Sequence, residues 1–264
     1  DATIRALELG AIDFVAKSAG PVANINNIRA EILEKCRIAA RTNVSRLKKI
    51  AIANIASVKY TPQPVAGNIK EHIVAIGTST GGPRALQEIL TKLPGNLPSG
   101  VVIVQHMPPG FTKSLSDRLN SMSALTVKEA EMDDVVQPGL VFIAPGNYHM
   151  VLERETDKTV IKLHQQPLIG GHRPAVDPLM ESVARIYGSR AIGVILTGMG
   201  HDGSKGIEAI KKQYGYTIAE DESTTVVFGM SKSAIELGVI DKILPVHDIA
   251  AEIVKQLQHK IGGV

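Results

Sequence analysis

The segment 73–90 constrains the fold most, because an apolar, β-branched run breaks into small residues and then restarts with helical spacing. The run predicts a buried strand, and Pro83 suits the first turn of a helix, where its missing N–H is not needed. Between them, Gly77-Thr78-Ser79-Thr80-Gly81 matches the G-x-S-x-G turn that holds a serine hydroxyl out of a sheet. We therefore expect a strand, a tight turn with Ser79 at its apex, and a helix.

A glycine-rich turn of this kind has two other uses. It can cradle a phosphate, as in a nucleotide-binding Rossmann-like module, or it can simply reverse the chain. The third glycine of a GxGxxG fingerprint and the lysine-serine pair of a P-loop are both missing here. The turn alone leaves a nucleophile, a phosphate site and a structural turn as open interpretations.

Strand and helix patterns alternate through the rest of the chain. The apolar runs predict strands at 101–104, 126–129, 140–144, 159–163, 192–196 and 216–219. Helical spacing predicts helices at 112–120, 176–187, 204–213, 228–237 and 247–257. Such alternation is typical of an α/β fold with a doubly wound, mainly parallel sheet in three α/β/α layers. Ligands of these sheets bind at the carboxyl ends of the strands.

Three predicted strands deliver polar side chains to that edge: Ser79, His106 and Asp202. A hydroxyl, an imidazole and a carboxylate are the groups that nucleophilic acyl transfer requires. Their order along the chain differs from that of α/β-hydrolases, so the likeness to that fold ends at the serine turn.

Each member of this set has alternatives. His106 could be structural, and His201 is a rival imidazole, while Asp202 could instead cap the helix that begins near 204. Rival carboxylates for Asp202 are Asp177, Glu220 and Asp221. The histidines show neither HxxxH nor HxH spacing, so no metal site is predicted.

Composition limits the remaining classes. The chain has 264 residues, 44% of them apolar, and a formal net charge of +3. A basic cluster at 35–49 lacks the interleaved aromatic residues that stack on bases, which favours a solvated linker over a nucleic-acid site. We predict that the single cysteine, Cys36, packs on the apolar side of a helix. The chain carries no signal peptide and no apolar run near the ~20 residues of a membrane span, so we expect a cytoplasmic protein.

The N-terminal region predicts a helix ending at Gly10, a strand at 11–17 and a helix through about residue 40. Residues 6–17 resemble the last third of a response-regulator receiver domain, with Lys17 at its switch lysine and Ser18 where proline is usual. The phosphoryl-accepting aspartate of that family would precede Asp1. We therefore expect a receiver remnant at 1–40, a linker at 41–68 and a catalytic domain at 69–264.

Beyond about residue 72 the sequence resembles the chemotaxis protein-glutamate methylesterase family (CheB). The motifs that carry the resemblance are 76–82, 105–111, 143–146, 172–174 and 193–203. The resemblance implies Ser79, His106 and Asp202 as the catalytic residues and no cofactor. It further implies an oxyanion hole at Met199 and Thr80, and a substrate cleft near His172 and Arg173. His201 stands where asparagine is frequent and could perturb the hydrogen bonds of Asp202.

The implied reaction is hydrolysis of glutamate γ-methyl esters on the cytoplasmic part of a chemoreceptor, together with deamidation of receptor glutamines. A histidine kinase would be the partner of a complete receiver domain, and neither nucleic acid nor membrane insertion is expected. In that family the unphosphorylated receiver covers the cleft, so we expect this chain to have a basal activity that a phosphodonor does not raise. A DNA-binding output domain is the remaining alternative, but no helix-turn-helix signal supports it.

Overall fold

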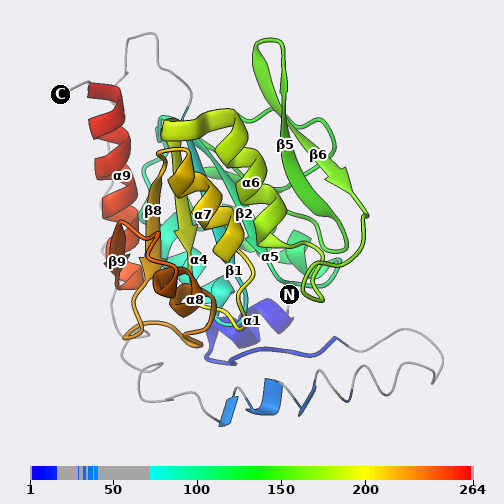
Figure 1. Ribbon diagram of the computed structural model, residues 1–264. Helices are drawn as coiled ribbons and strands as arrows, with labels where there is room; N and C mark the ends of the chain where they lie inside the picture. The colour runs from blue at the N-terminus through cyan, green and yellow to red at the C-terminus, as the bar shows by residue number, and fades with distance from the viewer. Residues whose placement is uncertain are drawn as a thin grey trace.

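A parallel sheet of seven strands lies at the centre of the molecule (Figure 1). The structure is a computed structural model that describes residues 2–16, residues 29, 32–33, 35–37 and 39–40, and residues 72–262. Every neighbouring pair of strands in this sheet runs parallel. In spatial order the strands are β3 (Thr126–Glu129), β4 (Leu140–Ile143), β2 (Ser99–Gln105), β1 (His72–Thr78), β7 (Ala191–Ile195), β8 (Tyr216–Glu220) and β9 (Lys242–Leu244).

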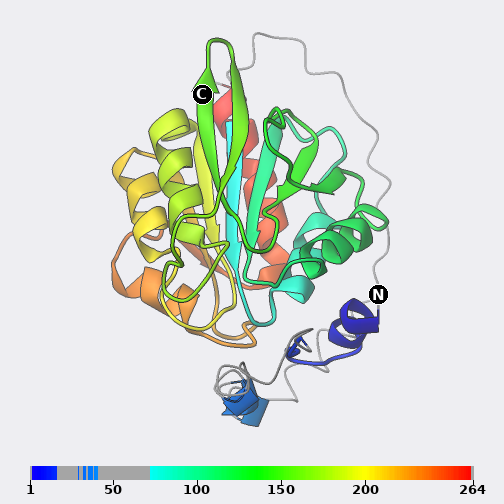
Figure 2. The same ribbon diagram turned by 90° about the vertical axis from the view of Figure 1, so that its right-hand side faces the viewer.

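Helices cover both faces of the sheet, which confirms the doubly wound three-layer fold. One face carries α1 (Ala2–Glu8), α4 (Gly82–Leu90), α5 (Phe111–Asn120) and α9 (Val246–Gly262). The other carries α6 (Val176–Tyr187), α7 (Ser204–Lys212) and α8 (Met230–Glu236), with a short 3-10 turn at Gly188–Arg190. A separate antiparallel hairpin of β5 (His149–Glu155) and β6 (Lys158–His164) packs on this second face, and its tip extends beyond the sheet (Figure 2).

The central strand explains why the apolar runs are continuous rather than alternating. Val74 and Ile76 of β1 belong to the core on one face, and Ile73 and Ala75 belong to the core on the other. All four side chains are fully buried. Burial of a large aliphatic side chain is worth roughly 1.5–3 kcal/mol, so a strand covered on both faces gains at every position.

Strand β1 lies between the two halves of the sheet. Strand β1 pairs with β2 on one side and with β7 on the other. The carboxyl ends of β1 and β7 therefore flank a topological switch point, the place where doubly wound sheets bind their ligands.

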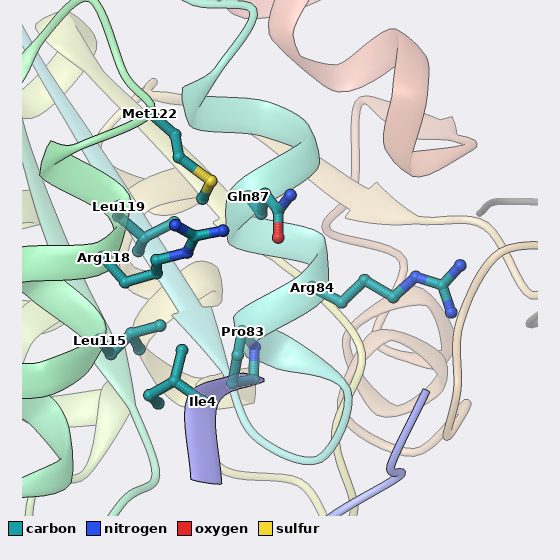
Figure 3. A pocket seen from close by; sticks show the side chains of 8 residues that line it. All are labelled: Ile4, Pro83, Arg84, Gln87, Leu115, Arg118, Leu119 and Met122. Carbon is teal, nitrogen blue, oxygen red and sulfur yellow. The ribbon is translucent and has the colours of Figure 1, made fainter. Parts of the chain in front are cut away.

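The N-terminal helix α1 packs against α4 and α5. Ile4 and Leu7 of α1 are buried, and Ile4 lies beside Pro83 of α4 and Leu115 of α5 (Figure 3). The Phe14 ring lies 4.5 Å from that of Phe111. The strand predicted at 11–17 was wrong, because residues 11–16 form no strand, and a strand requires a neighbour with which to pair. Lys17 and the linker 41–68 lie outside the described residues.

Several other local predictions need correction. The predicted helix through residue 40 is helical wherever it is described, but Cys36 is exposed rather than packed. The strand predicted at 159–163 exists as β6, although it belongs to the hairpin and not to the main sheet. Strands β5 and β9 were not predicted.

Candidate active site

The serine turn lies directly beyond β1. The Ser79 N–H donates to the Thr197 carbonyl at 3.0 Å, and the Gly82 N–H donates to the Ser79 carbonyl at 2.8 Å. Gly81 has a φ of 84°, and a Cβ there would lie 2.6 Å from a Val226 methyl group. Only glycine meets both conditions without strain, so the sharp turn that was predicted at Ser79 depends on it.

His106 occupies the corresponding position beyond β2. Thr78 and Gln105 are register partners at the ends of β1 and β2, and the His106 N–H extends the ladder by donating to the Thr78 carbonyl at 3.1 Å. Neighbouring strands lie ~4.8 Å apart, so Ser79 and His106 begin adjacent loops. The predicted convergence of these two loops is therefore observed.

Asp202 reaches the same place from the loop after β7. Its Oδ2 lies 2.7 Å from His106 Nε2, and both side chains are more than nine-tenths buried. The same carboxylate accepts the main-chain N–H groups of Val176 at 2.7 Å and Asp177 at 3.1 Å. These are the first two residues of α6, so Asp202 caps α6 from a distant part of the chain. The alternative cap of α7 is excluded, since Gly203 holds that position.

The surroundings of Asp202 keep it ionised. Burial alone would raise the pKa of Asp202, but the hydrogen bond and charge of His106 and the two α6 N–H groups lower it below its usual value. The positive end of the α6 dipole acts in the same direction. A carboxylate that already accepts two N–H groups requires a donor at His106 Nε2, so Nδ1 is left as the basic nitrogen.

His106 Nδ1 is buried and has no hydrogen-bond partner among the described residues. An unpaired buried nitrogen is costly, so His106 Nδ1 is a candidate for a functional atom. The imidazole can then accept a proton at Nδ1 while Nε2 stays bound to Asp202. This is the tautomer that a general base requires.

His172 stacks on His106, with ring centroids 3.9 Å apart and planes 10° apart. Burial, assisted by the nearby His106, lowers the pKa of His172 to about 4, so its ring is neutral near neutral pH. The stack fixes the plane of the His106 ring without adding charge. Arg173 instead holds loops together: its guanidinium donates to Asn147 Oδ1 at 2.7 Å and to the carbonyls of Gln165 and Gln166.

Of the two predicted oxyanion residues, Thr80 lies within the serine turn and Met199 lies in the loop after β7. Thr80 follows Ser79, and its hydroxyl donates to Asp13 Oδ2 at 2.7 Å. Met199 lies two residues beyond Thr197 and is 44% exposed. The Met199 loop is held from α8, because the Gly198 carbonyl accepts the N–H groups of Gly229 and Met230. A Cβ on Gly198 would come within 2.8 Å of the Ser79 Cβ, so this loop lies against the serine.

The rival residues make other contacts. The His201 side chain is exposed, and the hydrogen bonds of Asp202 go to His106 and α6 instead. Asp177 accepts the Gly206 N–H, and burial raises its pKa. Glu220 accepts the Thr197 N–H, and Asp221 accepts the Ser223 N–H.

The sequence did not reveal two residues that support the site. Gln105 is buried, and its Nε2 donates to the Ser79 carbonyl at 2.9 Å and the His106 carbonyl at 3.0 Å, joining the two loops. His149 accepts the Ala175 N–H and pairs with the Pro167 carbonyl, which fixes the entry to α6. The only sequence signal for Gln105 is a polar residue at the end of an apolar strand.

Within the described ranges, no group of three or more His, Cys, Asp or Glu side chains is arranged to hold a metal ion. The helices of the same ranges are all too short or too polar to span a bilayer.

A doubly wound parallel sheet with a serine turn and a buried histidine–aspartate pair at its carboxyl edge fits a hydrolase of the three-layer α/β class, distinct from the α/β-hydrolase fold. The family model described as CheB methylesterase matches residues 74–253, and the chain belongs to that family. A crystal structure of the Thermotoga maritima CheB methylesterase catalytic domain is 50% identical in sequence. It has a TM-score of 0.70 and covers 71% of this chain and 100% of its own.

Curated relatives extend over nearly the whole chain. A Pyrococcus horikoshii protein named protein-glutamate methylesterase/protein-glutamine glutaminase is 44% identical over 266 residues, covering 100% of this chain and 72% of the relative. A Pseudomonas aeruginosa protein, numbered 2 under the same name, is 43% identical over 265 residues, covering 100% and 74%. These matches give no support to the nucleotide-binding alternative.

Proposed function

We propose that this chain hydrolyses glutamate γ-methyl esters on chemoreceptors and deamidates receptor glutamines, with Ser79 as nucleophile, His106 as base and Asp202 as its partner. The observation that carries the proposal is the His106 ring, which is bound to Asp202 through Nε2 and leaves a buried Nδ1 unpaired, on a loop that begins next to the Ser79 loop. The family to which the chain belongs supports the substrate class.

The reaction begins when His106 Nδ1 removes the Ser79 proton and Oγ attacks the ester carbonyl carbon. Asp202 stays ionised and stabilises the imidazolium that forms. The tetrahedral oxyanion is held by the main-chain N–H groups of Met199 and Thr80, near the amino end of α4, whose dipole favours negative charge.

Collapse of this intermediate expels methoxide, which takes the proton from His106 and leaves as methanol. A water molecule, deprotonated by His106, then hydrolyses the γ-glutamyl ester of Ser79 and regenerates the enzyme. Deamidation follows the same course, with His106 protonating the departing ammonia. No step requires a cofactor.

The cleft is bordered by His172 and by the loop that Arg173 holds in place. The guanidinium of Arg173 is engaged by Asn147 and two carbonyls, so we assign it the role of shaping the cleft rather than binding a substrate carboxylate. The substrate partner is the cytoplasmic helical part of a chemoreceptor, which places the protein in the cytoplasm. A histidine kinase would act on a complete receiver domain.

Release of methanol from methylated receptor membranes tests the proposal. The wild-type chain should release methanol, and Ser79→Ala should lose ~10³-fold or more of the rate. If the wild type cleaves a simple activated ester but releases no methanol from receptors, the assignment of the catalytic residues stands and the assignment of the substrate is wrong. Equal rates for wild type and Ser79→Ala would show that Ser79 is not the nucleophile and serves only in the turn.

A further inference from the structure

A second buried carboxyl group lies at the sheet edge and takes no part in the mechanism above. Glu220 ends β8 and is 1% exposed. Its Oε2 accepts the main-chain N–H of Thr197 at 2.8 Å, and its Oε1 accepts the Thr224 hydroxyl at 3.0 Å. A buried carboxyl group needs a reason to be there, because an apolar side chain would avoid its desolvation cost.

Thr197 connects this carboxyl group to the serine turn. The Thr197 carbonyl accepts the Ser79 N–H at 3.0 Å and the Thr78 hydroxyl at 2.9 Å. Its own hydroxyl donates to the Thr80 carbonyl at 2.9 Å. Thr197 thus binds the Thr78 side chain and the main chain of Ser79 and Thr80.

The Thr197 hydroxyl uses its full bonding capacity. Besides donating to Thr80, it accepts the N–H groups of Val226 at 3.1 Å and Val227 at 3.0 Å. A hydroxyl offers one donor and two acceptor sites, so the rotation of this side chain is fixed. The last hydrogen-bonding group of Thr197 is its main-chain N–H, which donates to Glu220 Oε2.

Beyond β7 the backbone ladder no longer supplies an acceptor for this N–H. Ile195 is the last residue of β7 that pairs with β8, opposite Ala219. The Glu220 carboxyl group therefore replaces a strand carbonyl where the two chains separate. Loss of that acceptor would leave a buried N–H unpaired and release Thr197 from β8.

We propose that Glu220 is a positioning residue for Ser79, acting by holding the main chain of Thr197. The inference rests on the proposed function, in which Ser79 is the nucleophile. Glu220 itself lies behind Thr197 and contacts neither His106 nor Asp202. Its removal should therefore lower the reactivity of Ser79 and leave the KM for substrate unchanged.

The test compares Glu220→Ala with Glu220→Gln. An amide oxygen can accept the Thr197 N–H, and its NH2 can donate to Thr224, whose hydroxyl can turn to the Asp221 carbonyl already 3.4 Å away. The glutamine variant therefore keeps the connection, whereas alanine breaks it. Asp241→Ala is the matched control, because Asp241 Oδ2 accepts the Thr217 N–H at 3.0 Å from the same strand at its opposite end.

The readout is the rate at which a fluorophosphonate modifies Ser79 in folded protein, measured below the melting temperature of each variant. Misplacing a reacting group by about 1 Å costs ~10²-fold, so Glu220→Ala should react ~10- to 100-fold more slowly than wild type. Glu220→Gln and Asp241→Ala should stay within ~3-fold of wild type. A folded Glu220→Ala protein that reacts at the wild-type rate would overturn the inference.

Amide hydrogen exchange at the Ser79 N–H separates this inference from the proposed function. Glu220→Ala should accelerate that exchange, and Asp241→Ala should not. Equal modification of wild type and Ser79→Ala would reject the proposed nucleophile, while unchanged exchange in Glu220→Ala would reject the role of Glu220.

Discussion

Asp202 and Glu220 are both buried carboxyl groups at the same edge of the sheet, yet their pKa values shift in opposite directions. Asp202 receives a hydrogen bond from His106 and two N–H groups from the start of α6, and these outweigh the effect of burial. For Glu220, burial outweighs the Thr197 N–H and the Thr224 hydroxyl, and it raises the pKa to about 7. The comparison teaches that donors and nearby charge, rather than burial alone, decide whether such a group stays ionised.

The two carboxyl groups also bind different kinds of partner, a side chain for Asp202 and a main-chain N–H for Glu220. Asp202 orients a side chain that must carry a positive charge during the reaction, so it has to be an anion. Glu220 holds a main-chain N–H, which either a neutral or an ionised carboxyl group can do. Substitutions that remove charge but keep shape should therefore separate the two positions.

Asp202→Asn should show the largest difference. The amide cannot stabilise the His106 imidazolium, so methanol release should fall roughly 10³-fold or more, whereas Glu220→Gln should stay within ~3-fold of wild type. Initial rates on methylated receptor membranes provide the measurement. Comparable losses of rate in Asp202→Asn and Glu220→Gln would show that the two carboxyl groups do not differ in their need for charge.

His172→Ala removes the ring that stacks on His106. We expect kcat to fall on the order of 10-fold, because the imidazole gains freedom to leave its plane. His172→Phe should recover most of this loss, since His172 is neutral above its pKa of about 4 and contributes its shape rather than its charge. If kcat of His172→Phe is no higher than that of His172→Ala, the ring's shape alone does not explain the role of His172.

The two carboxyl groups should also differ in how they link stability to pH. Between pH 4.5 and about 7 the folded protein keeps a proton on Glu220 that the unfolded chain has released. The free energy of unfolding therefore falls as pH rises through this window. The charged groups that face Glu220 are Asp221, next to it in the chain, and Arg84 and Glu88 of α4, which line the same small cavity.

Urea unfolding at pH 5 and pH 8 tests this linkage. Glu220→Gln should gain stability over wild type on going from pH 5 to pH 8, on the order of 2 kcal/mol. Asp202 has a lowered pKa, so its stabilising contribution is present above its ordinary pKa of 3.8 and is lost as the pH falls below that value. An identical pH dependence for wild type and Glu220→Gln would show that Glu220 does not titrate in this window.

The sequence predicted the main sheet well because its strands are buried on both faces, and continuous apolar runs report that directly. Strand β9 has only three residues at an edge, and β5 has three apolar residues, 150–152, followed by the charged residues 153–155, so neither produced such a run. The strand predicted at 11–17 has the composition of a strand but no partner among the described residues.

The site was predictable only at the level of strand ends. Ser79, His106 and Asp202 follow strands whose carboxyl ends must meet at one edge, so their proximity could be inferred from the sequence. The cap that Asp202 places on α6, and the connection from Glu220 through Thr197, depend on contacts between segments at least 23 residues apart. Residue patterns carry no signal for such contacts.

The orientation of the His106 ring tests the account most directly. In the wild-type protein with 15N-labelled histidine, NMR should find an exchange-protected proton on Nε2, hydrogen-bonded to Asp202, and an unprotonated Nδ1. Modification of Ser79 by a fluorophosphonate should leave the Nε2 proton in place. A protected proton on Nδ1 of the free enzyme would contradict the account, because the nitrogen assigned to the serine proton would already be occupied.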